Sequence, residues 1–347
     1  MLNPNIFKKV NLLSLGVYIP NLRLDSSELV NNWQHSPQIT NSLGVKQKSV
    51  ANFDEDPLTM AVMASHRALK DSQIDPKSIG AVFVGSESHP YAVKPTSSML
   101  GWWLGLGHDY LAFDTEFACK AATSALIAAA SMVESGFIEN ALVVGSDKAQ
   151  SKPGDVLEFA AASAAVAVII GKRKGVAKLK AVNSYTSDTG DFWRRDNAEF
   201  PEHGGRFTGE PGYFLHIESA IQRFLEKYMR KISDFDKIVL HMPNAKFPKK
   251  LARKMHITEE QIKDSLTVSY IGNPYSASAL LGLANSLSKS EIGEKLLLAS
   301  YGSGSGSDVL SWEIDKNNYL KDFFEWQWQQ GKKISYFDYL NNYNFIK

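Results

Sequence analysis

The sequence predicts an α/β fold built from two similar halves. Short apolar runs alternate with segments of helical pattern along the chain, and one strand–loop–helix–strand unit occurs twice. The run 79–85 (IGAVFVG) is rich in small and β-branched residues, which is typical of a strand buried in a parallel sheet. The segment 58–72 before it has apolar residues at helical spacing. Such alternation indicates sheets that are covered by helices.

The internal repeat predicts where polar groups meet. Gly85 ends a strand 34 residues before Cys119, and His241 ends a strand 32 residues before Asn273. Each of these two later residues precedes a helix that carries Ser-Ala-Leu, and each helix leads into another apolar strand. A repeated unit of this kind is expected to pack on its copy. Pseudo-twofold packing would bring Cys119, Asn273, His241 and Glu87 together.

The two halves are expected to divide near the middle of the chain. We predict an N-terminal half over residues 1–171 and a C-terminal half over residues 172–347, which ends in a strongly aromatic tail. The segment 171–212 between the repeated units is predicted to be a long loop excursion with a strand near 177–185. Long structured loops often contribute to function.

Composition excludes several classes of protein. Of the 347 residues, 44% are apolar and 22% charged, and the net charge is +1, so no overall field favours nucleic acid or an anionic membrane. A single cysteine excludes an intrachain disulfide and a cysteine-based zinc site. The apolar run 164–170 is far shorter than the roughly 20 residues that span a bilayer. The start of the chain does not resemble a signal peptide, and we expect a soluble cytoplasmic protein.

Cys119 is the candidate nucleophile. It stands in EFACKAATSALIAAA, immediately before a helix of small residues. The free N–H groups and dipole of a helix start favour a thiolate, and the neighbouring Lys120 would add to this effect. The alternative is an inert cysteine in the core, which is the usual role of a lone cysteine.

His241 and the lysines after it form a second candidate group. His241 closes an apolar strand in IVLHMPNAKFPKK, and residues at strand ends of α/β proteins often face a cleft. Lys246, Lys249 and Lys250 follow, and cations near a catalytic histidine suit a phosphorylated ligand. The alternatives are a structural histidine and a solvated surface helix, and Lys249 is expected to belong to the latter.

Three further segments contain candidate polar groups. Asn273 lies in a Gly-Asn-Pro turn, where its amide would orient substrate or water, or simply belong to a turn with a helix cap. The glycine-rich loop that begins at Tyr301 lacks the ending of a P-loop, but it would let backbone N–H groups approach a thioester oxygen. Glu87 follows the strand 79–85 and is either a base in a cleft or a cap.

These motifs, taken in order, resemble the thiolase superfamily of condensing enzymes. The pattern is Cys, then His-x-Pro-Asn, then Gly-Asn-x-Tyr, then Tyr-Gly-Ser-Gly, and it resembles most closely the archaeal branch of hydroxymethylglutaryl-CoA synthases. The matching segments are GSESHPYAVKP, EFACKAAT, GSDKAQSKPGD, SDTGDFWRR, HGGRFTGEP, HMPNAKFP, IGNPYSAS and YGSGSGSD. The resemblance implies the five-layered αβαβα thiolase fold with two pseudo-twofold-related halves.

The resemblance also implies roles for individual residues. Cys119 would accept an acetyl group from acetyl-CoA, Glu87 would act as general base and acid, and His241 would handle a proton and position acetoacetyl-CoA. The product would be 3-hydroxy-3-methylglutaryl-CoA, with no metal or organic cofactor. Contacts to the CoA substrates are implied for Arg206, Thr208, Lys246, Lys250, Asn273 and Ser303.

The resemblance further implies assembly with other chains. A homodimer is expected, and so is a complex with acetoacetyl-CoA thiolase and a small zinc-ribbon/OB-fold protein, to which the aromatic tail would contribute. The sequence departs from the family pattern at Lys148, where threonine is expected, at 163–166, and within the His241 and Asn273 motifs. These departures concern pocket walls and therefore acyl-chain preference.

Two other functions remain open from the sequence. A ketoacyl synthase III-like enzyme would use the same cysteine, histidine and asparagine with an acyl carrier protein substrate, and it would need no carboxylate at Glu87. An inactive thiolase-fold scaffold protein would show no acetylation of Cys119.

Overall fold

The strands of both halves join in one sheet. In the computed structural model, which describes residues 7–317, 319–320, 323 and 330–343, nine strands are hydrogen bonded in the order β11-β12-β13-β8-β1-β7-β6-β4-β5. They are β1 (Asn11–Tyr18), β4 (Ile79–Gly85), β5 (Leu111–Thr115), β6 (Asn140–Lys148), β7 (Ser163–Gly171), β8 (Ala177–Thr186), β11 (Lys237–Leu240), β12 (Lys295–Ala299) and β13 (Gly306–Ile314). The strand expected near 177–185 is β8.

The pairing directions repeat from one half to the other. In the first half β4 runs parallel to β6, which is antiparallel to β7, which is antiparallel to β1. In the second half β11 runs parallel to β12, which is antiparallel to β13, which is antiparallel to β8. The two sets meet where β1 pairs with β8. The strand β5 extends the first set beyond β4, and no described strand does the same beyond β11.

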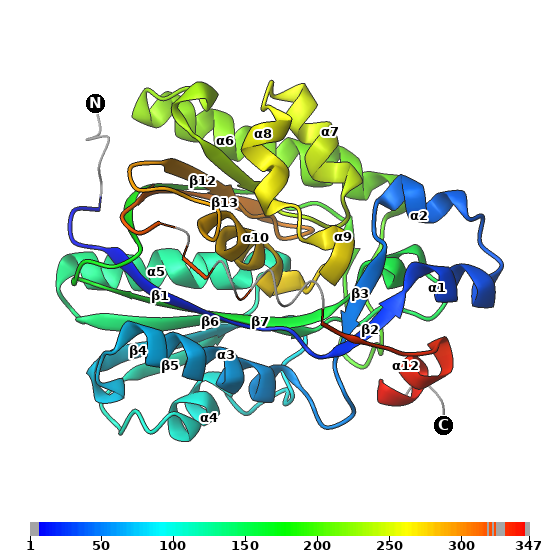
Figure 1. Cartoon of the computed structure of the whole chain (residues 1–347), viewed down its shortest axis with the longest axis horizontal. Helices are drawn as coiled ribbons and strands as arrows, with labels where there is room; N and C mark the ends of the chain where they lie inside the picture. The colour runs from blue at the N-terminus through cyan, green and yellow to red at the C-terminus, as the bar shows by residue number, and fades with distance from the viewer. Residues whose placement is uncertain (1–6, 318, 321–322, 324–329, 344–347) are drawn as a thin grey trace.

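Helices and strands form five layers (Figure 1). One outer layer covers the first-half strands, a central layer lies between the two sets of strands, and a second outer layer covers the second-half strands. The first outer layer is α3 (Pro57–Ser72) and α4 (Thr96–Trp103), the central layer is α5 (Ala121–Ser135) and α10 (Ser278–Leu287), and the second outer layer is α6 (Phe214–Tyr228), α7 (Lys246–Lys254) and α8 (Glu259–Ile262). The predicted αβαβα layering is confirmed.

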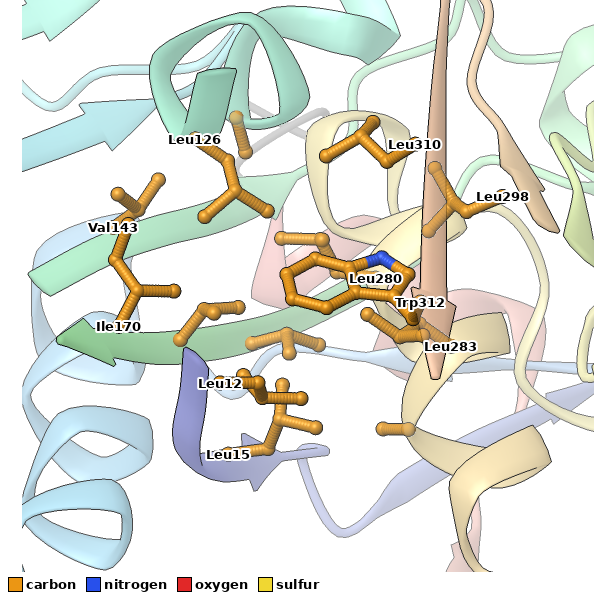
Figure 2. Packing of buried hydrophobic residues seen from close by; sticks show 14 of the residues in the cluster. Leu12, Leu15, Leu126, Val143, Ile170, Leu280, Leu283, Leu298, Leu310 and Trp312 are labelled. Carbon is orange, nitrogen blue, oxygen red and sulfur yellow. The ribbon is translucent and has the colours of Figure 1, made fainter. Parts of the chain in front are cut away.

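The central layer is held by one continuous apolar core. Leu126 on α5 and Leu280 and Leu283 on α10 pack between strands of both halves, with Trp312 of β13 among them (Figure 2). Removing this apolar surface from water is the main force that keeps the two halves together. Separate apolar clusters lie under the two outer helical layers.

Small residues let the central helices approach the sheet ends. A side-chain carbon at Gly85 would lie 2.4 Å from the backbone nitrogen of Ala122, so the end of β4 and the start of α5 can be this close only with glycine at that position. The consequence is that the residue after Ser86, which is Glu87, lies next to the turn that carries Cys119.

A smaller unit adjoins the five layers and includes the described part of the tail. Its elements are β2 (Leu22–Asp25), α1 (Ser26–Trp33), α2 (Gln38–Leu43), β3 (Gln47–Val50), β14 (Lys332–Lys333) and α12 (Tyr336–Asn342). Tyr336 and Tyr339 of α12 are buried against Leu24, Leu29 and Phe159, so this part of the aromatic tail packs on the chain itself. The remainder of the tail, residues 321–322, 324–329 and 344–347, lies outside the described residues.

Two further short strands pair outside the nine-stranded sheet, and one further α-helix has four residues. They are β9 (Phe192–Trp193), β10 (Glu202–His203) and α9 (Val268–Ile271). Across the described ranges, no helix has both the length and the apolar content needed to cross a membrane.

Candidate active site

A cavity of about 530 Å³ lies beside the start of α5. Its walls come from the loop after β4, the turn before α5, the β9–β10 region and the glycine-rich loop after β12. The lining residues are Glu87, Ser88, Glu116, Phe117, Ala118, Gln150, Phe192, Trp193, Arg194, Pro201, Tyr275, Ser303 and Ser305. Both halves of the chain therefore contribute to one cavity.

Cys119 lies in a short helical turn, Ala118–Lys120, that leads into α5. Its side chain is buried, and its thiol lies against the carboxylate of Glu87, the Oε1 of which has no described hydrogen-bond partner. Burial raises the pKa of the Cys119 thiol well above its usual range, and the charge of Glu87 raises it further. The expectation that the helix start would favour a thiolate is therefore wrong for the free protein, because burial next to a carboxylate outweighs the helix terminus.

Lys120 was expected to favour the Cys119 thiolate, but it is paired with a carboxylate of the second half. Its Nζ lies 3.1 Å from the carboxylate of Asp308 on β13 and 2.6 Å from Ser124 Oγ. Both partners of this ion pair are almost fully buried. Because one partner belongs to each half, the pair fixes the turn that carries Cys119 against the second half of the sheet.

Glu87 is held by a buried carboxylate that the sequence analysis did not single out. Asp147, at the end of β6, accepts hydrogen bonds from the Glu87 backbone N–H at 2.8 Å, from Ser88 Oγ at 2.6 Å and from the Ser276 N–H at 2.8 Å. Burial raises the pKa of Glu87 well above its usual range, and Asp147 raises it further. The available signal was a polar residue that ends a buried strand, the same signal that identified His241.

His241 directly follows β11 and is buried. Its backbone carbonyl accepts a 2.7 Å hydrogen bond from Tyr213 Oη, and its ring centroid lies 6.2 Å from that of Tyr301. Burial lowers the pKa of His241 to about 3, so the imidazole is neutral at physiological pH. In the described part of the chain, neither ring nitrogen has a hydrogen-bond partner.

Asn273 reaches the surroundings of Cys119 from the second half. Its backbone N–H donates to the Ala160 carbonyl at 2.7 Å, and its backbone pairs with Ala161 as an isolated bridge. Ala161 packs in one cluster with Cys119 and Tyr275. The side-chain Oδ1 of Asn273 is buried and has no partner among the described groups.

The predicted contacts to CoA lie in three places. Ser303 lines the main cavity. Thr208 ends a short helical turn and has a buried hydroxyl oxygen with no described partner, whereas Arg206 in the same turn is exposed and lies over the Phe207 ring. Lys246 and Lys250 are exposed and line another cavity of about 320 Å³.

The lysine-lined cavity is a basic groove. Lys249, which was expected to lie on a solvated surface helix, is one of its lining residues. The groove is lined by Asn41, Ser42, Gly44, Ala245, Lys246, Lys249, Lys250 and Arg253. Lys249 therefore belongs to the groove along with Lys246 and Lys250. Four cations on one helix give this groove a positive potential that suits a phosphorylated ligand.

Known families match both halves of the chain. Residues 6–174 match the family model described as hydroxymethylglutaryl-coenzyme A synthase N terminal. Residues 225–314 match the model described as 3-oxoacyl-[acyl-carrier-protein (ACP)] synthase III C terminal. The hydroxymethylglutaryl-CoA synthase of Archaeoglobus fulgidus is 46% identical over 333 residues, which cover 95% of this chain and 96% of the relative.

The chain belongs to the hydroxymethylglutaryl-CoA synthase family. The relative from Methanocaldococcus jannaschii is 46% identical over 313 residues, which cover 90% of this chain and 91% of that protein. The family suggested by the sequence motifs is thereby confirmed, and the protein is an acyltransferase.

Solved structures confirm the thiolase fold. An HMG-CoA synthase complexed with CoA aligns with a TM-score of 0.88 at 22% identity and covers 96% of this chain and 89% of its own. The 3-oxoacyl-[acyl-carrier-protein] synthase III from Aquifex aeolicus aligns with a TM-score of 0.80 at 22% identity and covers 88% of this chain and 100% of its own. These likenesses concern the fold, which both types of condensing enzyme share.

Proposed function

We propose that this member of the synthase family condenses acetyl-CoA with acetoacetyl-CoA and water to give 3-hydroxy-3-methylglutaryl-CoA and CoA. The observation that carries the mechanism is the proximity of the Cys119 thiol to the Glu87 carboxylate beside the cavity. A nucleophile and a base in direct contact are the minimum requirement for covalent acyl transfer.

Acyl transfer comes first. The raised pKa of Cys119 keeps the thiol protonated until acetyl-CoA binds. Glu87 then takes the proton as Sγ attacks the acetyl carbonyl, and the proton passes to the departing CoA sulfur. The product of this step is acetyl-Cys119, free CoA and an ionised Glu87.

Carbon–carbon bond formation follows at the same two residues. Glu87 removes a proton from the acetyl methyl group, and the resulting enolate attacks the ketone carbon of acetoacetyl-CoA. A neutral His241 has one N–H, and this unpartnered donor suits the alkoxide that forms at the ketone oxygen. The proton that Glu87 took from the methyl group then passes to the alkoxide, which gives the 3-hydroxyl group and an ionised Glu87. Asn273 supplies a further polar side chain near Cys119.

Hydrolysis completes the cycle. Water attacks the thioester at Cys119, the carbon–sulfur bond breaks, and the thiol is restored with a proton relayed by Glu87. The new carboxylate of 3-hydroxy-3-methylglutaryl-CoA is released with the CoA portion still attached.

The CoA contacts belong to the same proposal. Ser303 and Asn273 lie near the reactive end, while Thr208 and Arg206 stand on the turn that precedes α6. Lys246 and Lys250 supply cations for the phosphates of CoA, because the exposed groove on α7 presents them together.

The protein is further proposed to form a homodimer through β5. This edge strand exposes Leu111 and Phe113, and Trp102 and Trp103 are exposed at the end of the adjacent α4. An unpaired strand edge with exposed aromatic residues is a surface that monomeric proteins avoid. Phe113→Glu should convert the dimer to a monomer in analytical ultracentrifugation, whereas Phe137→Glu, at an exposed phenylalanine after α5, should not.

Other features of the proposal concern location and assembly. The halves 1–171 and 172–347 are proposed as the repeated units, since β7 ends at Gly171 and β8 begins at Ala177. A cytoplasmic location suits CoA thioester substrates and a free cysteine. A complex with acetoacetyl-CoA thiolase and a zinc-ribbon/OB-fold protein is proposed, and unchanged co-purification after deletion of residues 320–347 would exclude a role of the tail.

A ketoacyl synthase III-like reaction is the second candidate. The match of residues 225–314 to the acyl carrier protein synthase III model favours it. Such an enzyme decarboxylates its extender substrate and does not need a carboxylate base, so the contact between Glu87 and Cys119 favours the synthase reaction instead. A scaffold protein without activity would leave Cys119 unmodified.

Intact-protein mass spectrometry tests the proposal. Incubation with acetyl-CoA should add one acetyl group to the wild-type chain and none to Cys119→Ala. Acetoacetyl-CoA should then yield 3-hydroxy-3-methylglutaryl-CoA. Acetylation by an acyl carrier protein thioester alone, with none from acetyl-CoA, would support the second candidate.

A further inference from the structure

The active-site cavity contains an arginine for which the proposed mechanism has no role. Of the described residues that line it, Glu87 and Glu116 bear carboxylates, and Arg194 alone bears a permanent positive charge. Arg194 follows β9 directly, and its Nη1 donates a 3.2 Å hydrogen bond to the Ala198 carbonyl. The guanidinium is largely exposed, so it is available to a ligand in the cavity.

Other cations near the site are paired with a carboxylate or lie outside the main cavity. Lys120, next to Cys119, is buried in its ion pair with Asp308. Lys246 and Lys250 line the separate groove on α7. Among the charged side chains that line the main cavity, only Arg194 would therefore attract an anion.

The proposed reaction forms such an anion at Cys119. In the last step water adds to the thioester carbonyl, the carbon–sulfur bond breaks, and its electron pair leaves with sulfur. One water proton restores the thiol by way of Glu87, and the second leaves as the new carboxylic acid ionises. The charge thus appears beside Glu87 and Glu116, which repel it.

We infer that Arg194 binds the carboxylate of the 3-hydroxy-3-methylglutaryl group and thereby selects the hydrolysed product in the cavity. This inference rests on the proposed function and deepens it. A planar guanidinium can donate two parallel hydrogen bonds to a carboxylate, and an acetyl group or a neutral ester offers no such anion. The acetyl-CoA half-reaction, in which no carboxylate takes part, does not depend on this contact.

Binding of two matched ligands tests the inference. The ligands are 3-hydroxy-3-methylglutaryl-CoA and its methyl ester at the free carboxylate. Calorimetry is performed in the Cys119→Ala background, which cannot acylate, without and with Arg194→Gln, Arg194→Lys or Arg195→Gln. The control Arg195 is the adjacent arginine, is equally exposed and does not line the cavity.

The expected result is a change in preference and not a general loss of affinity. The parent should bind the acid about tenfold more tightly than the ester, as a charge-assisted pair provides. Arg194→Gln should bind both ligands equally, Arg194→Lys should keep part of the preference, and Arg195→Gln should keep all of it. Thermal unfolding of each variant verifies that it is folded.

Other results overturn the inference in distinguishable ways. A tenfold preference that survives in Arg194→Gln, or equal weakening of both ligands, places the carboxylate elsewhere. The inference would also be wrong if the Cys119→Ala parent bound the acid and the methyl ester equally. If the parent binds neither ligand, the proposed function itself fails.

Discussion

The two halves of the chain present their polar groups to the site in opposite ways. In the first half, Asp147 accepts hydrogen bonds from the Glu87 N–H and Ser88 Oγ, and also from the Ser276 N–H of the second half. The Glu87 carboxylate lies against the Cys119 thiol, and only its Oε1 lacks a described partner. In the second half, both ring nitrogens of His241 and the Oδ1 of Asn273 are buried without a described partner.

This difference indicates a division of labour. The hydrogen bonds to Asp147 fix the backbone at Glu87, which suits a base that must keep one geometry through three steps. A buried polar atom without a partner costs about 1–3 kcal/mol, and a ligand that supplies the partner recovers that cost on binding. We therefore propose that the first half holds the reacting groups and that the second half is left open for substrate. Substitutions on both sides of the site test this contrast.

The largest effect is expected from removing the reacting pair. Cys119→Ala should lower product formation roughly 10⁴-fold or more, because the covalent route is lost. Glu87→Gln should lower condensation by about 10²–10⁴-fold, because the enolate no longer has a base. Rates are measured by chromatography of the CoA products.

A matched carboxylate provides the control for the base. Glu116→Gln alters another cavity-lining acid, whose Oε1 accepts from the Ala118 N–H and which is expected to retain most activity. Equal losses in Glu87→Gln and Glu116→Gln would mean that the cavity needs negative charge in general and not a base at Glu87.

The next largest effect is expected on stability, when the hydrogen bonds to Asp147 are weakened. Asp147→Asn replaces an acceptor of several hydrogen bonds by an amide with only one oxygen, and the free energy of unfolding should fall by about 2–4 kcal/mol. Urea unfolding monitored by tryptophan fluorescence measures the change. Unchanged stability would show that these hydrogen bonds do not hold the Glu87 loop.

A substitution at His241, in the second half, is expected to raise the free energy of unfolding. His241→Phe removes two buried nitrogens without partners and keeps a ring against Tyr301, so it should raise the free energy of unfolding by about 1 kcal/mol at pH 7.5 while abolishing condensation.

The gain from His241→Phe should depend on pH in a defined direction. The folded-state pKa of His241 is lowered from 6.5 to about 3, so between these values the unfolded chain binds a proton that the folded chain does not. As the pH falls below 6.5, the free energy of unfolding of the wild type should therefore decrease further relative to that of the variant, by up to about 1.4 kcal/mol for each pH unit. A difference that does not vary with pH would mean that His241 is accessible to water.

The smallest effect is expected at the link between the C-terminal helix and the Glu87 loop. The Nζ of Lys148 donates to the backbone carbonyl of Asn342 at 3.1 Å, and its backbone N–H donates to Ser88 Oγ at 3.1 Å. Lys148→Met should loosen α12 and lower the free energy of unfolding by about 1 kcal/mol, with faster amide exchange in residues 336–342. Lys152→Met, at an exposed lysine, is the control. Equal amide exchange of residues 336–342 in both variants would mean that Lys148 does not hold α12.

Much of the fold followed from local pattern. The helix expected over 58–72 is α3, the strand expected over 79–85 is β4, and the strand expected near 177–185 is β8. These elements were predictable because period and composition report which face of an element is buried.

Part of the site was not predictable because it depends on contacts between distant segments. Lys120 was expected to support the thiol, but Asp308, 188 residues later, binds its ammonium group. Asp147 stood in a quoted motif without a role, and its partners include Ser276, 129 residues away. Arg194 enters the cavity through a loop whose path no periodic pattern specifies.

The repeated α/β unit, the family and the short set of side chains with suitable chemistry could all be inferred from the order of residues. Those properties depend on the identity and order of residues, which can be read along the chain. Only the tertiary structure decided which polar atoms are paired and which are left open, and in what direction burial moves the pKa values of Cys119, Glu87 and His241. Desolvation and hydrogen bonding depend on neighbours in space, and folding brings those neighbours from both halves of the chain.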